Sequence, residues 1–407
     1  MNRLQAFLAS IAPGLFLIGY NIGTGSITTM AASGAAYGMK MIWPLVLSCV
    51  FTYFLIIAFG KFTAVTGQTV LHSYRQHFGS GITMVVLIAL LLSEWVSSIG
   101  VMAIVVQVVQ EWSRPLTESG NGFSPFLLTT IFAILLYWIY WQGKHRFFER
   151  ILAVFVGLMG LSFLLTTLMV KPDGEAILRG LIPQLPTSSD EWLIMAGMVG
   201  TTMGAILFVV RSILVQEKGW GVAELKWERR DARISVLLML GLSAAIMMAA
   251  AGTLHLQGQR VENAIDMVRL LEPLAGRFAI SIFVGGIVCA GLSSLFPIVI
   301  LAPWLIADYE GKPREMTATR SRLLVLFGVL LGFVVPIFGG RPVSVMITSQ
   351  AAIAIASPIV LILMVILLNR PSIMGKHIAK RWENALYAVI ILFTILMAIA
   401  GLKGIFS

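Results

Sequence analysis

The sequence predicts an all-α integral membrane protein with about eleven transmembrane helices. Hydrophobic residues make up 58% of the 407 residues and charged residues only 12%, a composition typical of chains that face lipid rather than water. Apolar stretches near or above the roughly 20 residues that span a bilayer recur along the whole chain. Two of them, the first and the sixth, are interrupted by glycine and hydroxyl residues, which predicts broken helices at these two places.

The predicted spans follow one another with short connections. They cover about 11–36, 41–60, 82–110, 123–142, 150–170, 192–216, 234–257, 278–306, 322–339, 343–369 and 384–403. The first span has a polar centre and a long apolar continuation, so we do not expect a cleavable signal peptide. The longest connections, at 171–191, 217–233 and 258–277, leave no room for a soluble domain. A single transmembrane domain over 1–407 is therefore the expected organisation.

The positive charge follows the expected membrane topology. With a cytoplasmic N-terminus and alternating spans, nineteen of the 29 Lys and Arg residues fall on the inner side and nine on the outer side, and Arg211 remains inside a span. This asymmetry obeys the positive-inside rule. It predicts a multi-pass protein of the inner or plasma membrane, with the N-terminus cytoplasmic and the C-terminus outside. The net charge of +10 is thus explained without a nucleic-acid partner.

The interruption of the first span is the run Gly23-Thr24-Gly25-Ser26, and that of the sixth is Gly200-Thr201-Thr202-Met203-Gly204. Backbone groups freed at bilayer depth need a partner from protein, water or ligand. Breaks at corresponding positions in two halves of a chain are typical of the midplane substrate site of secondary transporters. The alternative is that these small residues only let neighbouring helices pack closely.

The positions of the two breaks also predict an internal repeat. Because five spans separate the start of the first from the start of the sixth, the two broken helices enter the membrane from opposite sides, as an inverted repeat of five helices requires. The first repeat would cover about 11–170, the second about 192–369, and an extra helix about 384–403.

Several short segments resemble signatures of one transporter family. They are the stretch from Ala32 to Trp43, Val65-Thr66-Gly67, Ser212-Ile213-Leu214-Val215-Gln216, Ala290-Gly291-Leu292-Ser293-Ser294, and Ser349-Gln350 with Pro358. Their order and spacing resemble the Nramp family of proton-coupled divalent metal importers. This resemblance covers most of the chain, and it implies a LeuT-type inverted-repeat fold, no ATPase part, and transport by alternating access.

The chain departs from the family at the metal site. The family motif of helix one is Asp-Pro-Gly-Asn, and the same positions here are Gly23, Thr24, Gly25 and Ser26. The helix-six motif is Met-Pro-His, at the positions of the segment 204–206, which reads Gly-Ala-Ile here. Carboxylate and thioether donors that offset the dehydration of a transition metal ion are therefore absent. We assign no metal ligands from the sequence.

The chemistry of the two breaks favours an anionic group. Half-helices that start near Gly25 and Gly204 would present free amides and a positive dipole end to the midplane. The stretch from Ile22 to Gly25 is also similar to the Ile-Gly-Ser/Thr-Gly run of amino-acid transporters with the same fold. The favoured substrate is a small carboxylate-bearing organic solute, an organic acid or amino-acid-like compound. Its expected contacts are Gly23, Thr24, Gly25, Ser26, Thr202, Gly204 and Ala205, with Gln350 added by the family resemblance.

Two other functions stay open from the sequence alone. The first is transport of a divalent metal cation, as the family resemblance implies. The second is a non-transporting membrane sensor or scaffold that kept the fold. An enzyme is not expected, because no nucleophile–base set or phosphate-binding loop is visible, and the oligomeric state is not predicted.

The residues expected to couple transport to an ion lie within spans. Glu94 is ionisable and mid-span, which suggests a functional role; the resemblance places it at an acidic position associated with proton movement, where the family's second acid is Ser97 here. Arg211 occupies a family histidine position and could pair with Glu94, counter a substrate anion or extend to the inner interface. Ser293 and Ser294 match hydroxyls that bind Na⁺ in sodium-coupled relatives of the fold. Proton coupling is thus expected, sodium is the alternative, and no bound cofactor is expected.

Overall fold

The computed structural model describes residues 23–143, 145–170, 173–270 and 279–406, and these residues form helices and connecting loops without a strand. Nine helical segments among them are long and apolar enough to cross a membrane. The predicted spans at 11–36 and 150–170 correspond to α2 and α6, and residues 11–22 of the first lie outside the described part. The structure therefore agrees with the predicted all-α membrane architecture.

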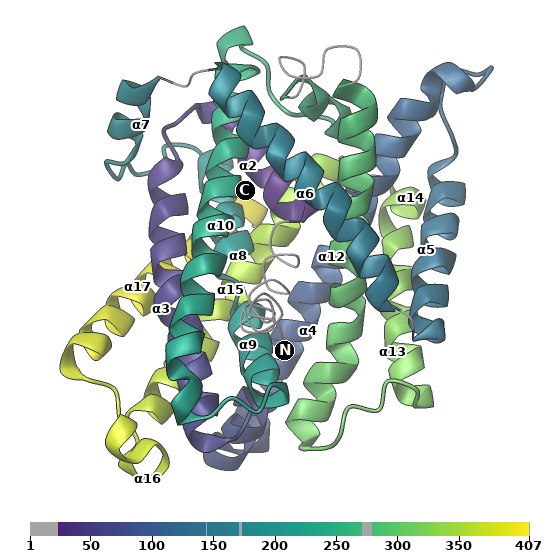
Figure 1. Ribbon diagram of the computed structural model, residues 1–407. Helices are drawn as coiled ribbons and strands as arrows, with labels where there is room; N and C mark the ends of the chain where they lie inside the picture. Colours follow the sequence, from purple (N-terminus) through teal and green to yellow (C-terminus); the bar gives the residue numbers. More distant parts are fainter. Residues whose placement is uncertain (1–22, 144, 171–172, 271–278, 407) are drawn as a thin grey trace, which may run out of the picture.

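The principal helices are arranged as in Figure 1. In chain order they are α2 (Thr24–Tyr37), α3 (Ile42–Thr66), α4 (Val70–Ser113), α5 (Pro125–Gln142), α6 (His145–Val170), α7 (Gly174–Gly180), α8 (Ser189–Met203), α9 (Ala205–Glu217), α10 (Leu225–Gly252), α12 (Ala279–Glu310), α13 (Thr319–Leu330), α14 (Val334–Phe338), α15 (Pro342–Leu368), α16 (Pro371–Met374) and α17 (Arg381–Phe406). A short 3-10 segment, η4 (Ala264–Leu270), lies between α10 and α12.

The helices divide into a buried centre and a lipid-facing periphery. In the most apolar window of α8–α9, 94% of the residues are buried, against 22% in α5 and 22% in the α13–α14 segment. Figure 1 shows α5, α13 and α14 at the right edge of the molecule and α16 and α17 at the left. The helix α15 packs against α4, α8 and α17, while α10 packs against α2 and α3. The two halves of the sixth span are thus enclosed by other helices.

Two glycines with left-handed backbone conformations shape the α3–α4 region. The helix α3 ends at Thr66, and Gly67 (φ +70°) donates its amide to the Thr63 carbonyl at 2.8 Å, a C-cap that glycine adopts without strain. In α4, Gly79 (φ +85°) separates a polar first segment from the membrane span. The predicted span began at 82 because hydropathy does not detect the polar turns that precede the kink.

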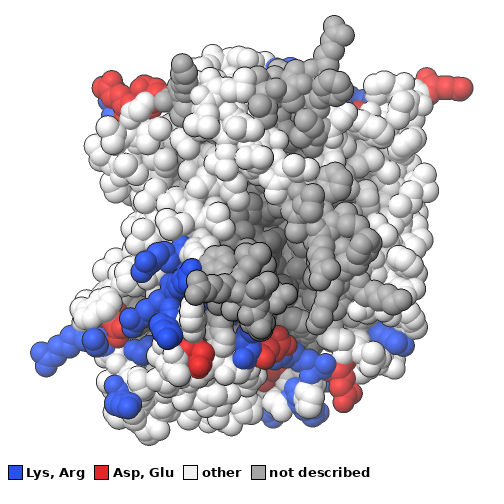
Figure 2. All heavy atoms as spheres, in the orientation of Figure 1, with Lys and Arg blue, Asp and Glu red and all other residues white. Residues whose placement is uncertain are grey.

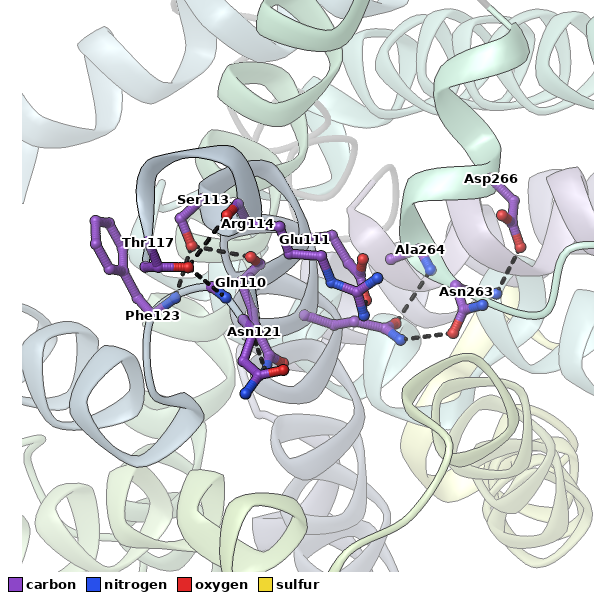
Figure 3. A network of polar contacts seen from close by, with 12 residues as sticks. Gln110, Glu111, Ser113, Arg114, Thr117, Asn121, Phe123, Asn263, Ala264 and Asp266 are labelled. Atoms are coloured by element: carbon purple, nitrogen blue, oxygen red, sulfur yellow. Dashed lines mark hydrogen bonds and ion pairs between the residues drawn. The ribbon is translucent and has the colours of Figure 1, made fainter. Parts of the chain in front are cut away.

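A polar network connects the C-terminal end of α4 to the loops beside it (Figure 3). The amide of Phe123 donates to Ser113 Oγ at 2.8 Å, which ties the loop before α5 to the end of α4. The side chain of Gln107 holds the segment that leads into η4: its Nε2 donates to Asn263 Oδ1 at 3.0 Å, and its Oε1 accepts from the Ala264 amide at 3.0 Å. These bonds satisfy loop amides and hold η4 against α4.

Candidate functional site

The sixth span breaks at Gly204. The helix α8 ends at Met203, Gly204 is extended (φ −64°, ψ +138°), and α9 begins at Ala205. Ser357 on α15 bridges the break, because its hydroxyl donates to the Met203 carbonyl at 3.4 Å and accepts from the Ala205 amide at 3.1 Å. The structure confirms the predicted interruption and shows that part of the freed backbone is satisfied by a neighbouring helix.

The described part of the first span begins at Gly23, where the sequence predicts the other break. Gly23 is extended (φ −102°, ψ −168°), and α2 starts at Thr24 with no side-chain cap. The first turn is buried, and the Gly23 carbonyl accepts from the Ile27 amide at 3.1 Å. The N-terminal ends of α2 and α9 therefore lie near the positions expected from the sequence. Residue 22 and those before it lie outside the described residues.

Both N-terminal ends border one partly open cavity of about 30 Å³. The cavity lies between α2, α4, α8, α9, α12 and α15, and its lining combines hydroxyls, one amide, one thioether and aliphatic groups. The lining residues are Gly23, Gly25, Ser26, Ser97, Val101, Gly200, Thr201, Gly204, Ile206, Ser294, Ile298, Met346, Gln350 and Ile353. Six of them were predicted from the sequence as substrate or ion contacts: Gly23, Gly25, Ser26, Gly204, Ser294 and Gln350.

Four other predicted residues lie beside the cavity without lining it. The Thr202 hydroxyl donates to Ser48 Oγ at 2.7 Å, and the Ala205 amide bonds to α15 as described above. The Ser293 hydroxyl donates to the carbonyl of Ala290 in its own helix at 3.3 Å. Thr24 faces α12 instead, since a Cβ placed on Gly291 would lie 3.5 Å from Thr24 Oγ1. The side chains of Thr202 and Thr24 are thus turned towards neighbouring helices, whereas the Ser293 hydroxyl bonds within α12.

Two buried hydroxyls in this region have no hydrogen-bond partner among the described residues. They are Thr24 Oγ1 and Ser294 Oγ. A buried hydroxyl without a partner is costly, so these two oxygens are available to a ligand or a water molecule. Ser294 lines the cavity directly, and its role in ion coupling stays a prediction.

The opposite wall of the cavity is formed by α15 and α4. A Cβ placed on Gly25 would lie 2.6 Å from Met346 Cε and 2.8 Å from Gln350 Nε2, so a larger residue at this position would displace the ends of these two side chains. Gln350 Nε2 also donates to Ser97 Oγ at 3.3 Å and to Ser349 Oγ at 3.4 Å. The amide of Gln350 thus joins α4 to α15 at the edge of the cavity.

The contributions of Met346, Ser97 and Thr201 were not anticipated from the sequence. The spacing to Gln350 could have indicated that Met346 lines the same cavity. Met346 precedes Gln350 by four residues, and residues four apart share a helix face. The same spacing relates Ser97 to Val101 on α4. Met346 supplies a thioether from α15, whereas the family motif places one on helix six.

Glu94 is 1% exposed and lies on α4 one turn before Ser97. It does not line the cavity, but residues three apart on a helix are neighbours. Glu94 is therefore one turn away from a residue of the cavity lining. This position is compatible with the predicted role in proton movement.

Arg211 is fully buried, with 0% exposure, and it pairs with two acids on α10. Its Nε donates to Glu228 Oε1 at 3.1 Å and its Nη2 to Glu228 Oε2 at 2.5 Å, while Nη1 donates to Asp231. The guanidinium also lies 5.7 Å from the ring centre of Trp220. The expectation that Arg211 extends to the inner interface is therefore wrong, and its ionic partners are Glu228 and Asp231 rather than Glu94. Both acids lie in the segment 217–233, which the sequence analysis treats as a connection between spans.

The electrostatics of the cavity are set by dipoles rather than by lining charges. None of the described lining residues is ionisable. Within the described parts of the chain, no group of three or more His, Cys, Asp or Glu side chains could hold a metal ion. What the cavity offers is hydroxyl, amide and thioether groups, backbone carbonyls and two helix N-terminal ends.

Comparison with known proteins identifies the family. The family model described as "Natural resistance-associated macrophage protein-like" matches residues 14–403. A divalent metal cation transporter MntH from Nostoc sp. is 23% identical over 403 residues, which cover 94% of this chain and 88% of the relative. A protein of the same name from Deinococcus radiodurans is 26% identical over 274 residues, 64% of this chain and 61% of the relative.

Solved structures support the same fold. A crystal structure of the Eremococcus coleocola manganese transporter has a TM-score of 0.77 at 14% identity and covers 99% of this chain and 87% of its own. The transporter MhsT in complex with L-phenylalanine gives a TM-score of 0.62 at 13% identity, with 98% of both chains covered. The LeuT-type fold that the sequence resemblance implied is confirmed. The chain belongs to the Nramp family and is a multi-pass secondary transporter.

Proposed function

We propose that this protein transports a divalent metal cation by alternating access, with the ion held in the cavity between α2, α9 and α15. The sequence favoured an organic solute and kept metal transport as the alternative. Full-length relatives named divalent metal cation transporters support the alternative more strongly. The observation that carries the proposal is the size and lining of the cavity.

The cavity is of ionic rather than organic size. A water molecule needs a cavity volume of about 10–15 Å³. A cavity of about 30 Å³ therefore holds two or three particles of that size, for example an ion with one or two waters. Pockets for organic ligands typically measure about 300–1,000 Å³. A carboxylate-bearing solute would therefore require the helices to separate, whereas a small cation would not.

The lining suits a partly hydrated cation held by neutral donors. Ser26, Ser97, Thr201 and Ser294 offer hydroxyl oxygens and Gln350 an amide oxygen. Oxygen ligands suit Mg²⁺ and Mn²⁺, and Mg²⁺ usually keeps several of its waters. Because no described lining residue is an acid, we expect weaker binding than at a carboxylate site.

The test is uptake and thermal stabilisation with the purified full chain. In proteoliposomes, Mn²⁺ entry is followed with an enclosed fluorescent chelator, and Mg²⁺, small carboxylates and amino acids are added as competitors. We expect Mn²⁺ or Mg²⁺ to raise the unfolding temperature, since a ligand stabilises the folded state in proportion to the logarithm of its saturation. Stabilisation by a carboxylate, with no response to either metal, would contradict the proposal.

A small organic anion remains the second candidate because of the helix ends. The N-terminal ends of α2 and α9 border the cavity without an acidic residue in its described lining, and such ends favour anions. The competitor panel distinguishes the two candidates directly. An anion that competes with uptake and stabilises the protein alone would establish this second function.

Restoring donors of the family motif should strengthen metal binding. The variant Gly23→Asp places a carboxylate at the edge of the cavity, and Ser26→Asn adds an amide oxygen. We expect the double variant to bind Mn²⁺ at least ten-fold more tightly, which corresponds to about 1.4 kcal/mol. Isothermal titration with Mn²⁺ measures the change, and Ser26→Asn alone is the control without added charge. Unchanged affinity would mean that the ion does not bind beside Gly23.

We also propose that Glu94 carries the coupling proton. In Glu94→Gln the neutral side chain cannot load or release a proton, so uptake should lose its dependence on pH while metal binding persists. Uptake between pH 5 and 8 in proteoliposomes measures this. The matched control is Glu111→Gln, an acid on the same helix that pairs with Arg114. An unaltered pH profile in Glu94→Gln would exclude Glu94 as the coupling residue.

Sodium coupling stays the alternative at Ser294. Its hydroxyl and that of Thr24 are buried without partners in the described structure, which a bound Na⁺ would satisfy. Replacing sodium by choline at constant pH should leave uptake unchanged if protons alone are coupled. A drop in uptake that Ser294→Ala removes would indicate a sodium site instead.

A further inference from the structure

The first turns of α10 have two faces of opposite charge. Lys226, Arg229, Arg230 and Arg233 follow the spacing i, i+3, i+4 and i+7, which places them on one helix face, and all four are exposed. Figure 2 shows Lys and Arg gathered at the lower end of the molecule, where α10 begins in Figure 1. Seven residues of helix correspond to roughly 10 Å, so this basic stripe extends from the end of α10 into its membrane part.

The acids of the same segment point inward. Glu228 and Asp231 are 2% and 1% exposed and are bound to Arg211. They are therefore not available to neutralise the outer face. Trp227, 38% exposed, lies within the stripe and contacts Lys226 at 5.4 Å and Arg230 at 5.9 Å from its ring centre. The outer face combines four cations with an aromatic ring of the kind found at membrane interfaces.

Apolar side chains continue the stripe towards the bilayer centre. Leu237 and Leu238 are 61% and 43% exposed, and Leu237 follows Arg233 by four residues on the same face. A ligand that covers both the basic stripe and the exposed leucines carries negative charge at one end and hydrocarbon at the other. We propose that the basic stripe of α10 binds an anionic phospholipid, with its phosphate at Arg229 and Arg233 and an acyl chain along Leu237.

This site is independent of the transported substrate. The same α10 segment holds Arg211 of α9, the second half of the broken sixth span. A lipid bound to the outer face would stabilise the α9–α10 contact from outside. We therefore expect an anionic lipid to raise the stability of the folded protein.

The experiment uses the full chain in neutral detergent and soluble short-chain lipids. Dioctanoyl-phosphatidylglycerol is titrated against dioctanoyl-phosphatidylcholine, and an apparent dissociation constant is taken from the rise of the unfolding temperature. Each Lys or Arg near an anionic surface contributes about five-fold in affinity. The double variant R229Q/R233Q should therefore bind phosphatidylglycerol about 30-fold more weakly and keep its unfolding temperature without lipid.

The control removes the same charge elsewhere. Lys376 and Lys380 are exposed residues near α16, and K376Q/K380Q should bind phosphatidylglycerol as the wild type does. The variant R229K/R233K, which keeps the charges, should retain most of the affinity. Equal stabilisation by the two lipids, equal loss in both glutamine variants, or an equal shift with inorganic phosphate alone would each overturn the proposal.

Discussion

Gly25→Leu is expected to abolish uptake in proteoliposomes while the protein remains folded. Even the Cβ of the new side chain would lie 2.6 Å from Met346 Cε and 2.8 Å from Gln350 Nε2. The remaining methyl groups would occupy the 30 Å³ cavity and displace the ion and its waters. Overpacking of this kind costs typically about 1–3 kcal/mol, so a lowered but cooperative unfolding transition should accompany the loss of transport.

The matched control for this variant is Gly241→Leu. Gly241 lies in α10 with no heavy atom within 4 Å of an added Cβ, so the same substitution should leave uptake near the wild-type level. Stabilisation by Mn²⁺ should also disappear in Gly25→Leu and persist in Gly241→Leu. Wild-type uptake by Gly25→Leu would place the substrate path away from this cavity.

Arg211→Met is expected to destabilise the protein by about 3–5 kcal/mol, because removing one partner of a buried ion pair leaves an uncompensated charge. Here the loss would remove the guanidinium that binds both Glu228 and Asp231, and both acids are almost fully buried. Relaxation is restricted, since a Cβ on Gly60 of α3 would already lie 1.9 Å from Glu228 Oε1. Denaturant titration in detergent measures the change in the free energy of unfolding.

A triple variant separates structural from coupling roles of this ionic cluster. Arg211→Met combined with Glu228→Gln and Asp231→Asn also removes the acidic charges and should recover most of the lost stability. Arg260→Met is the control, because Arg260 and Asp190 form an exposed pair and such pairs contribute little. If the stable triple variant transports with a normal pH profile, the predicted ion-coupling role of Arg211 is excluded.

The substrate prediction shows where local reasoning was insufficient. The missing Asp, Asn and Met donors at the two breaks favoured an organic anion, and beyond the breaks the resemblance supplied Gln350 as the only other substrate contact. The structure adds Ser97 from α4 and Met346 from α15 to the same cavity and places Gln350 beside them. These donors come from helices whose sequence carries no break, so their contribution depends on helix rotation. The small volume then argues for an ion.

The membrane spans, the two interrupted helices and the family resemblance were determined by the sequence alone. These features are local. The hydrophobic length of a span is set by bilayer thickness, and a run such as Gly23–Ser26 can be recognised from a few consecutive residues. The tertiary structure decided which side chains meet. Ser26 faces the cavity while Thr24 faces α12, and Arg211 pairs with acids of α10. In a membrane, hydropathy scarcely distinguishes helix faces, because lipid and protein interior are both apolar; packing between neighbouring helices fixes their rotation.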